Sequence, residues 1–132
     1  MIETLDIHTR SRTELIEITP QIRQIARKQG IQHGVCYVFV PHTTAGVTIN
    51  ENADPDVQRD MLAEINKIVP FDDHYAHGEG NSAAHIKSSL FGTSLFVFVE
   101  NGDLVLGTWQ GIYFCEFDGA RRRTVFIKVV AD

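Results

Sequence analysis

The sequence has no long apolar run and little cysteine, and each absence excludes a class of protein. No stretch of the 132 residues approaches the 18 or more consecutive apolar residues of a membrane-spanning helix, so we expect no membrane partner. The N-terminal residues MIETLDIHTR lack the pattern of a signal peptide, which favours a cytoplasmic location. The two cysteines do not form a CxxC motif, which argues against a zinc or redox site of that kind.

An excess of basic residues is also missing. The chain has 12 Lys and Arg against 17 Asp and Glu, a formal net charge of −5. Nucleic-acid surfaces draw mainly on Lys and Arg to contact phosphates, so we expect no nucleic-acid partner. A small phosphorylated ligand stays compatible with this charge, because it needs only a local cationic pocket. The hydrophobic content of 43% is ordinary for a globular chain, and we expect one domain over residues 1–132.

Both cysteines lie inside apolar runs. Cys36 is in VCYVFV and Cys115 is in IYFCEF. Residues in such runs are usually buried, and a free cysteine behaves there as a small hydrophobic side chain. We therefore expect two reduced, buried thiols in preference to a disulfide or a pair of ligands.

Hydrophobic periodicity and turn residues predict many short strands and a few helices. Strands are expected over residues 2–9, 13–19, 34–41, 46–50, 94–100, 103–109, 111–117 and 124–130. Helices are expected from Thr19 to Arg27, from Asp54-Pro55 to the residue before Pro70, and from Ser82 to Phe91. Asn101-Gly102 predicts a hairpin turn. The fold class is α+β, an antiparallel β-sandwich-like core with two or three flanking helices.

Several of these strands are apolar on both faces. The clearest is GVCYVFVP (34–41), which we expect to be covered on both sides. A chain of this length has few elements with which to cover so many faces. One sheet face is therefore expected to pack against another subunit.

Polar residues are concentrated directly after this strand, in PHTTAGVTINENADPD (41–56). Polar groups at the end of an apolar strand commonly form sites. His42 is equally well explained as a functional or a structural residue. Asp54 is sufficiently explained as the cap of the following helix.

Three of the six histidines lie in DDHYAHGEGNSAAHIKSS (72–89). His77 and His85 could converge with His42 on a divalent transition metal, although scattered surface histidines are the commoner explanation. The backbone N–H groups at Asn81-Ser82 could contact a phosphate. Lys87 lies on a different helix face from His85 and is either solvated or close to an anionic ligand.

The stretch GTWQGIYFCEFDGARRR (107–123) holds a lone acid in an apolar strand and three consecutive arginines. Trp109 is either a core residue or an aromatic platform. Glu116 is costly to bury unless it pairs with one of the arginines at 121–123 or with a metal. The arginines themselves are either a solvated turn or a phosphate clamp.

The segments HTTAGVTINENADPDV, AHIKSSLFGTSL and GTWQGIYFCEFDGARRR together resemble the YjbQ-like family, also called the secondary thiamine-phosphate synthase family. The likeness covers nearly the whole chain in the expected order. It implies a β-sandwich-like domain that assembles as a homotrimer, with sites near subunit boundaries. It also implies a pocket with three metal-binding histidines, which in this chain are His42, His77 and His85.

The activity that the resemblance implies is the joining of a pyrimidine diphosphate to a thiazole phosphate, with release of pyrophosphate. Such a reaction calls for a divalent metal ion (zinc, magnesium or manganese) and for cations that hold the leaving group. Dedicated enzymes of this reaction are TIM barrels, for which this chain is too short. We therefore expect the activity to be secondary to another one.

These observations lead to one hypothesis with two alternatives. In the first, the protein is a metal-dependent enzyme acting on a small phosphorylated heterocycle, and Glu116, His85 and Lys87 are catalytic. The substrate-binding residues would be Asn50, Glu51, Asp54, Trp109, Gln110 and Arg122. Glu116→Gln is then expected to lower activity far more than stability. The alternatives are a non-catalytic trimer that binds a small ligand or metal, and a phosphoester hydrolase that uses the same site.

Overall fold

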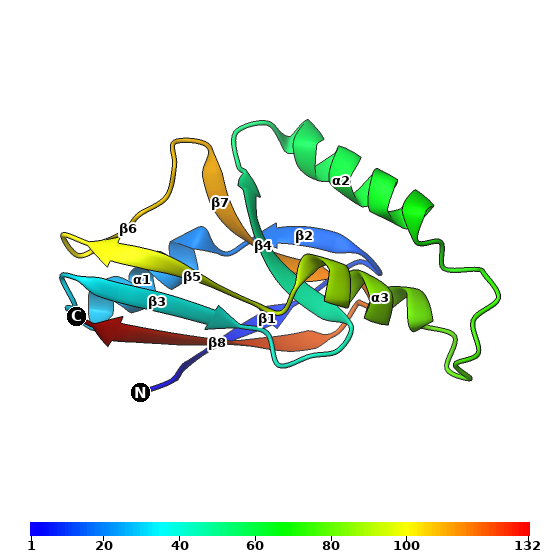
Figure 1. The fold of residues 1–132 in the computed structure, drawn as a ribbon, viewed down its shortest axis with the longest axis horizontal. Coiled ribbons are helices and arrows are strands. Elements are labelled where there is room, and N and C mark those ends of the chain that lie inside the picture. The colour runs from blue at the N-terminus through cyan, green and yellow to red at the C-terminus, as the bar shows by residue number, and fades with distance from the viewer.

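The computed structural model describes all 132 residues and has the predicted α+β architecture (Figure 1). Its elements are β1 (Glu3–His8), β2 (Glu14–Glu17), α1 (Thr19–Lys28), β3 (Gly34–Phe39), β4 (Ala45–Glu51), α2 (Pro55–Ile68), α3 (Ser82–Phe91), β5 (Ser94–Glu100), β6 (Asp103–Leu104), β7 (Gln110–Glu116) and β8 (Arg122–Ala131). No helix is long and apolar enough to span a membrane.

The strands form two antiparallel sheets that share one core. The larger sheet has the order β1-β8-β3-β5-β6, and the smaller one has the order β2-β7-β4. A single cluster of 17 buried apolar residues draws on both sheets and on α1, which contributes Ile22 and Ala26. Burial of this shared core drives the two sheets together.

The outer face of β3 and β5 is apolar and exposed. Tyr37 and Phe39 of β3 and Phe96 and Phe98 of β5 are each about half exposed, between 47% and 57%. These two strands are paired in the sheet, so the four rings form one surface. The prediction that residues 34–41 are covered on both faces is therefore wrong for a single chain, in which only the alternate residues face the core.

The hairpin at Asn101-Gly102 is confirmed, but the strand after it is shorter than predicted. Both turn residues have positive φ, 53° and 76°, as a two-residue hairpin turn of this sequence requires. Only Asp103–Leu104 continues the sheet. Beyond Val105 the chain turns at Gly107, whose N–H donates to the side chain of Gln110.

The helix starts follow the predictions in one case and not in the other. Asp54 caps α2 by accepting a hydrogen bond from the N–H of Asp56 at 2.9 Å. Thr19, predicted to cap α1, is instead its first residue. Its hydroxyl donates to Glu17 and accepts the N–H of Ile112, so it ties α1 to β7 instead of capping the helix.

Close packing of α3 and the residues after it against the start of β4 brings distant segments together. The hydroxyl of Ser88 donates to the carbonyl of Ala45 at 2.6 Å. A Cβ at Gly46 would lie 2.6 Å from the carbonyl oxygen of Gly92, so only glycine permits this approach. The contact places α3 beside the loop that leads into β4.

Candidate functional site

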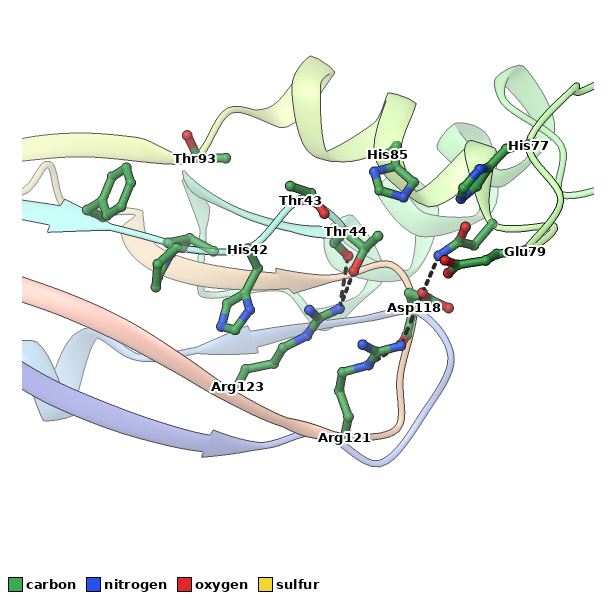
Figure 2. Close-up of a pocket in the computed structure, with 14 residues that line it drawn as sticks. His42, Thr43, Thr44, His77, Glu79, His85, Thr93, Asp118, Arg121 and Arg123 are labelled. Carbon is green, nitrogen blue, oxygen red and sulfur yellow. Dashed lines mark hydrogen bonds and ion pairs between the residues drawn. The ribbon is translucent and has the colours of Figure 1, made fainter.

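A pocket of about 930 Å³ opens where the loop before β4, the loop into α3 and the β7–β8 turn meet (Figure 2). Its lining is mainly polar, in contrast to the core. The polar and charged residues in it are His42, Thr43, Thr44, His77, Glu79, Asn81, His85, Thr93, Asp118, Arg121 and Arg123. The structure thus brings all three predicted histidines to one pocket.

Two of these histidines lie side by side. The rings of His77, from the loop before α3, and His85, on α3, are 5.7 Å apart between centroids and nearly perpendicular. Figure 2 shows both rings on one side of the pocket, whereas the carboxylate of Glu79 is directed toward Asp118. We refer to His77 and His85 as the histidine side.

His42 lies on the opposite side, next to Arg123 (Figure 2). Its Nε2 accepts the backbone N–H of Thr124 at 3.0 Å, so this nitrogen carries no proton. Burial, together with the charge of Arg123, lowers the pKa of His42. The ring is therefore neutral at pH 7, with its proton on Nδ1.

The pocket contains side chains of the kinds that bind a divalent metal, but they are not arranged around one position. No three His, Cys, Asp or Glu side chains are placed to hold one ion. His42 is separated from the other two rings, and its Nε2 is already occupied. The histidine side supplies two imidazoles, so an ion bound there would need further ligands from a bound molecule or from water.

Glu116 is fully buried behind the pocket instead of lining it. Its carboxylate accepts hydrogen bonds from Arg123 Nε at 2.9 Å, from Arg123 Nη2, from the N–H of Asp118 at 2.9 Å and from the hydroxyl of Thr9 at 2.8 Å. Burial alone would raise the pKa of Glu116, but these donors outweigh it and the pKa is lowered. Glu116 is therefore an enclosed anion that holds its neighbours in place.

Arg123 is the arginine that pairs with this acid, and it also faces the pocket. Its Nη2 donates to the carbonyl and hydroxyl oxygens of Thr44, at 3.1 and 2.8 Å. Nε and Nη2 are fixed by these bonds, whereas Nη1 makes no hydrogen bond within the protein. The side chain lines the pocket although it is only 2% exposed, so Nη1 is the end that a ligand could meet.

Arg121 lines the pocket as well, whereas Arg122 does not. Arg121 donates from Nε to the carbonyl of Asp118 at 2.9 Å and from Nη2 to its carboxylate at 3.2 Å. Arg122 is exposed and does not line the pocket. Along β8 the side chain of Arg123 faces inward and that of Arg122 faces outward, as alternation along a strand requires.

The charges of the pocket are nearly balanced and are spatially divided. The pocket is lined by two guanidinium groups, of Arg121 and Arg123, and by two carboxylates, of Glu79 and Asp118. Arg123 lies beside His42, away from the paired imidazoles, and Glu79 lies near Asp118. We refer to His42 and Arg123 as the arginine side. One side suits an anion and the other suits a cation.

Lys87 is buried outside the pocket. Its ammonium donates to Asn66 at 2.7 Å and lies 3.6 Å from the centre of the Phe71 ring, as does the guanidinium of Arg12. Burial lowers the pKa of Lys87 to about 8. The two cations hold Phe71, at the start of the loop that carries His77.

The remaining predicted substrate-binding residues form a second group at the far end of β4. This distal group consists of Asn50, Glu51, Asp54, Trp109 and Gln110. Glu51 is paired with Gln110 across the sheet, and the N–H of Asn52 donates to the carbonyl of Trp109. Trp109 is 63% exposed, so it is not a core residue. β4 separates the distal group from the pocket by about 20 Å, at about 3.4 Å a residue.

Glu79, Thr93 and Asp118 line the pocket but were not singled out from the sequence. Among the three arginines, strand alternation could have selected Arg123, which shares its side of β8 with the buried Val125 and Ile127. No sequence signal places Asp118 against Asn81, because that contact joins the β7–β8 turn to α3.

Comparison with known proteins gives a consistent result over the whole chain. The family described as UPF0047 protein YjbQ-like matches residues 3–132. UPF0047 protein YugU of Bacillus subtilis is 53% identical over 131 residues, covering 98% of this chain and 99% of that protein. UPF0047 protein YjbQ of Escherichia coli O157:H7 is 35% identical and covers 93% of each chain.

Solved structures agree with this relationship. A crystal structure of an uncharacterized conserved yjbq/upf0047 family protein from Clostridium acetobutylicum is 51% identical, with a TM-score of 0.95, and covers 97% of this chain and 99% of that one. A YbjQ-like protein of unknown function from Sulfolobus solfataricus is 31% identical, with the same TM-score, and covers 100% and 97%. The fold is shared across this range of identity.

Proposed function

The chain belongs to the YjbQ-like UPF0047 family, and we propose that it is an enzyme acting on a small phosphorylated heterocycle bound in the pocket between β4, α3 and the β7–β8 turn. The observation that carries this proposal is the division of the pocket. A guanidinium with a free end, on Arg123, faces the same space as the paired imidazoles of His77 and His85.

The arginine side supports phosphate binding. Nη1 of Arg123 can donate to a phosphate oxygen, while Glu116 and Thr44 keep the guanidinium from moving. Nδ1–H of His42 is a further donor beside Arg123, and the exposed hydroxyl of Thr43 is a donor elsewhere in the pocket. Hydrogen bonds from a charged, preoriented donor are the stronger kind, and they favour an anionic group here.

The histidine side supports the chemical step. His77 and His85 would act as the proton acceptor or donor at the group next to the bound phosphate, the roles that histidine most often has in catalysis. A divalent ion that entered with the phosphate would stabilise the charge on the departing oxygen, and His77 and His85 are the residues that would contact it. Zinc and manganese would accept imidazole ligands, whereas magnesium prefers oxygen ligands and would enter bound mainly to the phosphate.

Two reactions fit this arrangement. In thiamine-phosphate synthesis, a pyrimidine diphosphate would lose pyrophosphate to the arginine side while its ring is transferred to a thiazole phosphate. In phosphoester hydrolysis, water would take the place of the acceptor. We propose the transfer as a secondary activity of the site. Its acceptor would occupy the rest of the 930 Å³ pocket, which is too large for a phosphate alone.

We also propose that the protein works as a homotrimer. Three of the four half-exposed rings on the outer face of β3 and β5, those of Tyr37, Phe39 and Phe96, line a hollow of about 580 Å³, together with Val38, Ser94 and Leu95. Exposed apolar patches of this kind mark interfaces. Phe39 and Thr93, at the edge of this face, also line the pocket, so a second chain covering the face would reach the pocket rim.

The test is turnover of a phosphorylated pyrimidine with and without added divalent ion. His85→Ala removes one ring of the histidine side, and we expect at least a 100-fold loss of rate, as for a lost general acid or base. His33→Ala is the matched control, since His33 is exposed and bonds only to Glu100. Undiminished turnover in His85→Ala would exclude the enzyme proposal for this site. Binding without turnover across a panel of phosphorylated substrates would favour the alternative, a non-catalytic protein that binds a small ligand.

A further inference from the structure

The segment that carries His77, residues 70–80, makes no hydrogen bond to the rest of the protein. Its hydrogen bonds are internal, such as the one from the hydroxyl of Tyr75 to the carbonyl of Pro70. Figure 1 shows this connection extending past the end of α2 and the start of α3. The position of His77 in the pocket therefore depends on how the two ends of the segment are attached.

The two ends are attached in different ways. At the end next to α3, Nδ2 of Asn81 donates to the carboxylate of Asp118 at 2.9 Å. At the end next to α2, the partly buried ring of Phe71 lies 3.6 Å from the ammonium of Lys87 and 3.6 Å from the guanidinium carbon of Arg12. A cation over an aromatic face is attracted by the ring, so these two side chains hold the start of the segment.

Lys87 is the more unusual of the two cations, because it is completely buried and no carboxylate pairs with it. Its ammonium donates to Oδ1 of Asn66, near the end of α2, at 2.7 Å. A buried charge is costly, and an apolar side chain of similar size often fills such a place at lower cost. The contacts that offset the cost are those to Asn66 and Phe71. Both lie where α2 gives way to the segment.

The same helix that carries Lys87 carries His85, two residues earlier. The rings of His85 and His77 are 5.7 Å apart between centroids. We infer that Lys87 is a positioning residue, which holds the segment through Phe71 so that His77 stays beside His85. The inference rests on the proposed function and deepens it, because it explains how the histidine side is assembled. The role of Lys87 is then indirect, and the sequence-based prediction of a catalytic lysine is replaced by it.

Kinetics of two substitutions test the inference. Lys87→Met removes the charge and keeps a long apolar side chain, and Phe71→Leu removes the aromatic face. Each is expected to lower kcat for a phosphorylated pyrimidine by about 10-fold or more, since small displacements of reacting groups are costly. KM should change by less than about twofold, because the arginine side is intact. The double variant should lose no more than the larger single effect, as both changes break one contact. Lys67→Met, at an exposed lysine of α2, is the matched control and should leave kcat unchanged.

A second measurement does not depend on turnover. In protein labelled with 13C-histidine, an NOE between ring protons of His77 and His85 reports their contact. We expect this NOE in the wild type, in Lys67→Met and in Phe71→Tyr, which keeps the aromatic face. It should lose most of its intensity in Lys87→Met and Phe71→Leu.

The two measurements separate the inference from the proposed function. Absence of the NOE in the wild type, or its full intensity in a folded Lys87→Met, overturns the inference while the enzyme proposal stands. Should Lys87→Met fail to fold, the comparison of Phe71→Leu with Phe71→Tyr decides the same question. The expected NOE changes without turnover in any of the proteins would overturn the proposed function, and the positioning of His77 by Lys87 would stand.

Discussion

Arg123 and Glu116 form an ion pair that is almost completely enclosed, with side-chain exposures of 2% and 0%. The same carboxylate accepts the N–H of Asp118, and Asp118 in turn holds Asn81 and Arg121. A single buried acid therefore fixes residues on both sides of the pocket.

Glu116→Gln is expected to destabilise the fold strongly. The substitution leaves the guanidinium of Arg123 buried without a counter-charge, and breaking a buried pair in this way costs about 3–5 kcal/mol. The free energy of unfolding in urea measures the loss. Glu100→Gln is the control, because Glu100 is exposed, and it should change stability by less than about 0.5 kcal/mol. A loss below 1 kcal/mol in Glu116→Gln would show that the pair adds little to folding.

Acid should remove the difference in unfolding free energy between the wild type and Glu116→Gln. The folded-state pKa of Glu116 lies below its ordinary value of 4.5, so the unfolded chain binds the extra proton first as the pH falls. The contribution of Glu116 is thus complete above pH 4.5 and is lost as the pH falls through the folded-state pKa. Unfolding free energies of the wild type and Glu116→Gln, measured from pH 7 to pH 2, should converge at the acid end. A constant gap would contradict this.

Gly46→Ala should weaken the packing of α3 on β4. The added methyl carbon would lie 2.6 Å from the carbonyl oxygen of Gly92, and backbone on both sides leaves it little room. We expect a loss of about 1–3 kcal/mol, typical of overpacking, measured by thermal unfolding. Gly78→Ala is the matched control, since no atom lies within 4 Å of a Cβ there. An equal melting temperature for the two variants would argue against close contact at Gly46.

Both cysteines should resist thiol reagents in the native protein. Burial raises the pKa of Cys36 to about 11 and also raises that of Cys115, so neither thiolate is populated at pH 8. Treatment with iodoacetamide at pH 8 should label neither thiol until urea is added, and then label both, as mass spectrometry would detect. Rapid labelling of the folded protein would refute the buried positions of these residues.

The sequence predicts the elements of this fold well because their signals are local. Asp54 before Pro55 caps α2, and Asn101-Gly102 turns the chain back. The shorter β6 differs because sheet pairing ends with Leu104, and the apolar run that follows has no partner strand. Tertiary contact overrides the local pattern there.

The site is predicted less completely, because it depends on contacts between distant segments. The meeting of His77 and His85 follows from a folded-back loop that glycines permit, but the separation of His42 depends on how β4 packs on α3. The expectation that Glu116→Gln would spare stability assumed an acid facing the substrate. In the structure Glu116 is fully buried and paired with Arg123, so its replacement is expected to cost stability. The sequence could not predict this, because it does not show which arginine contacts Glu116.

The two ends of β4 have a consequence for the assembled protein. About 20 Å of strand separates His42 from Glu51, so a small molecule cannot touch the pocket and the distal group of one chain at once. In a trimer whose sites lie between chains, one chain would contribute its pocket and the next its distal group. Two inactive variants, His85→Ala and Glu51→Ala, would then recover part of the activity when co-expressed. The active sites would be those in which the Glu51→Ala chain supplies the intact pocket and the His85→Ala chain supplies the intact distal group.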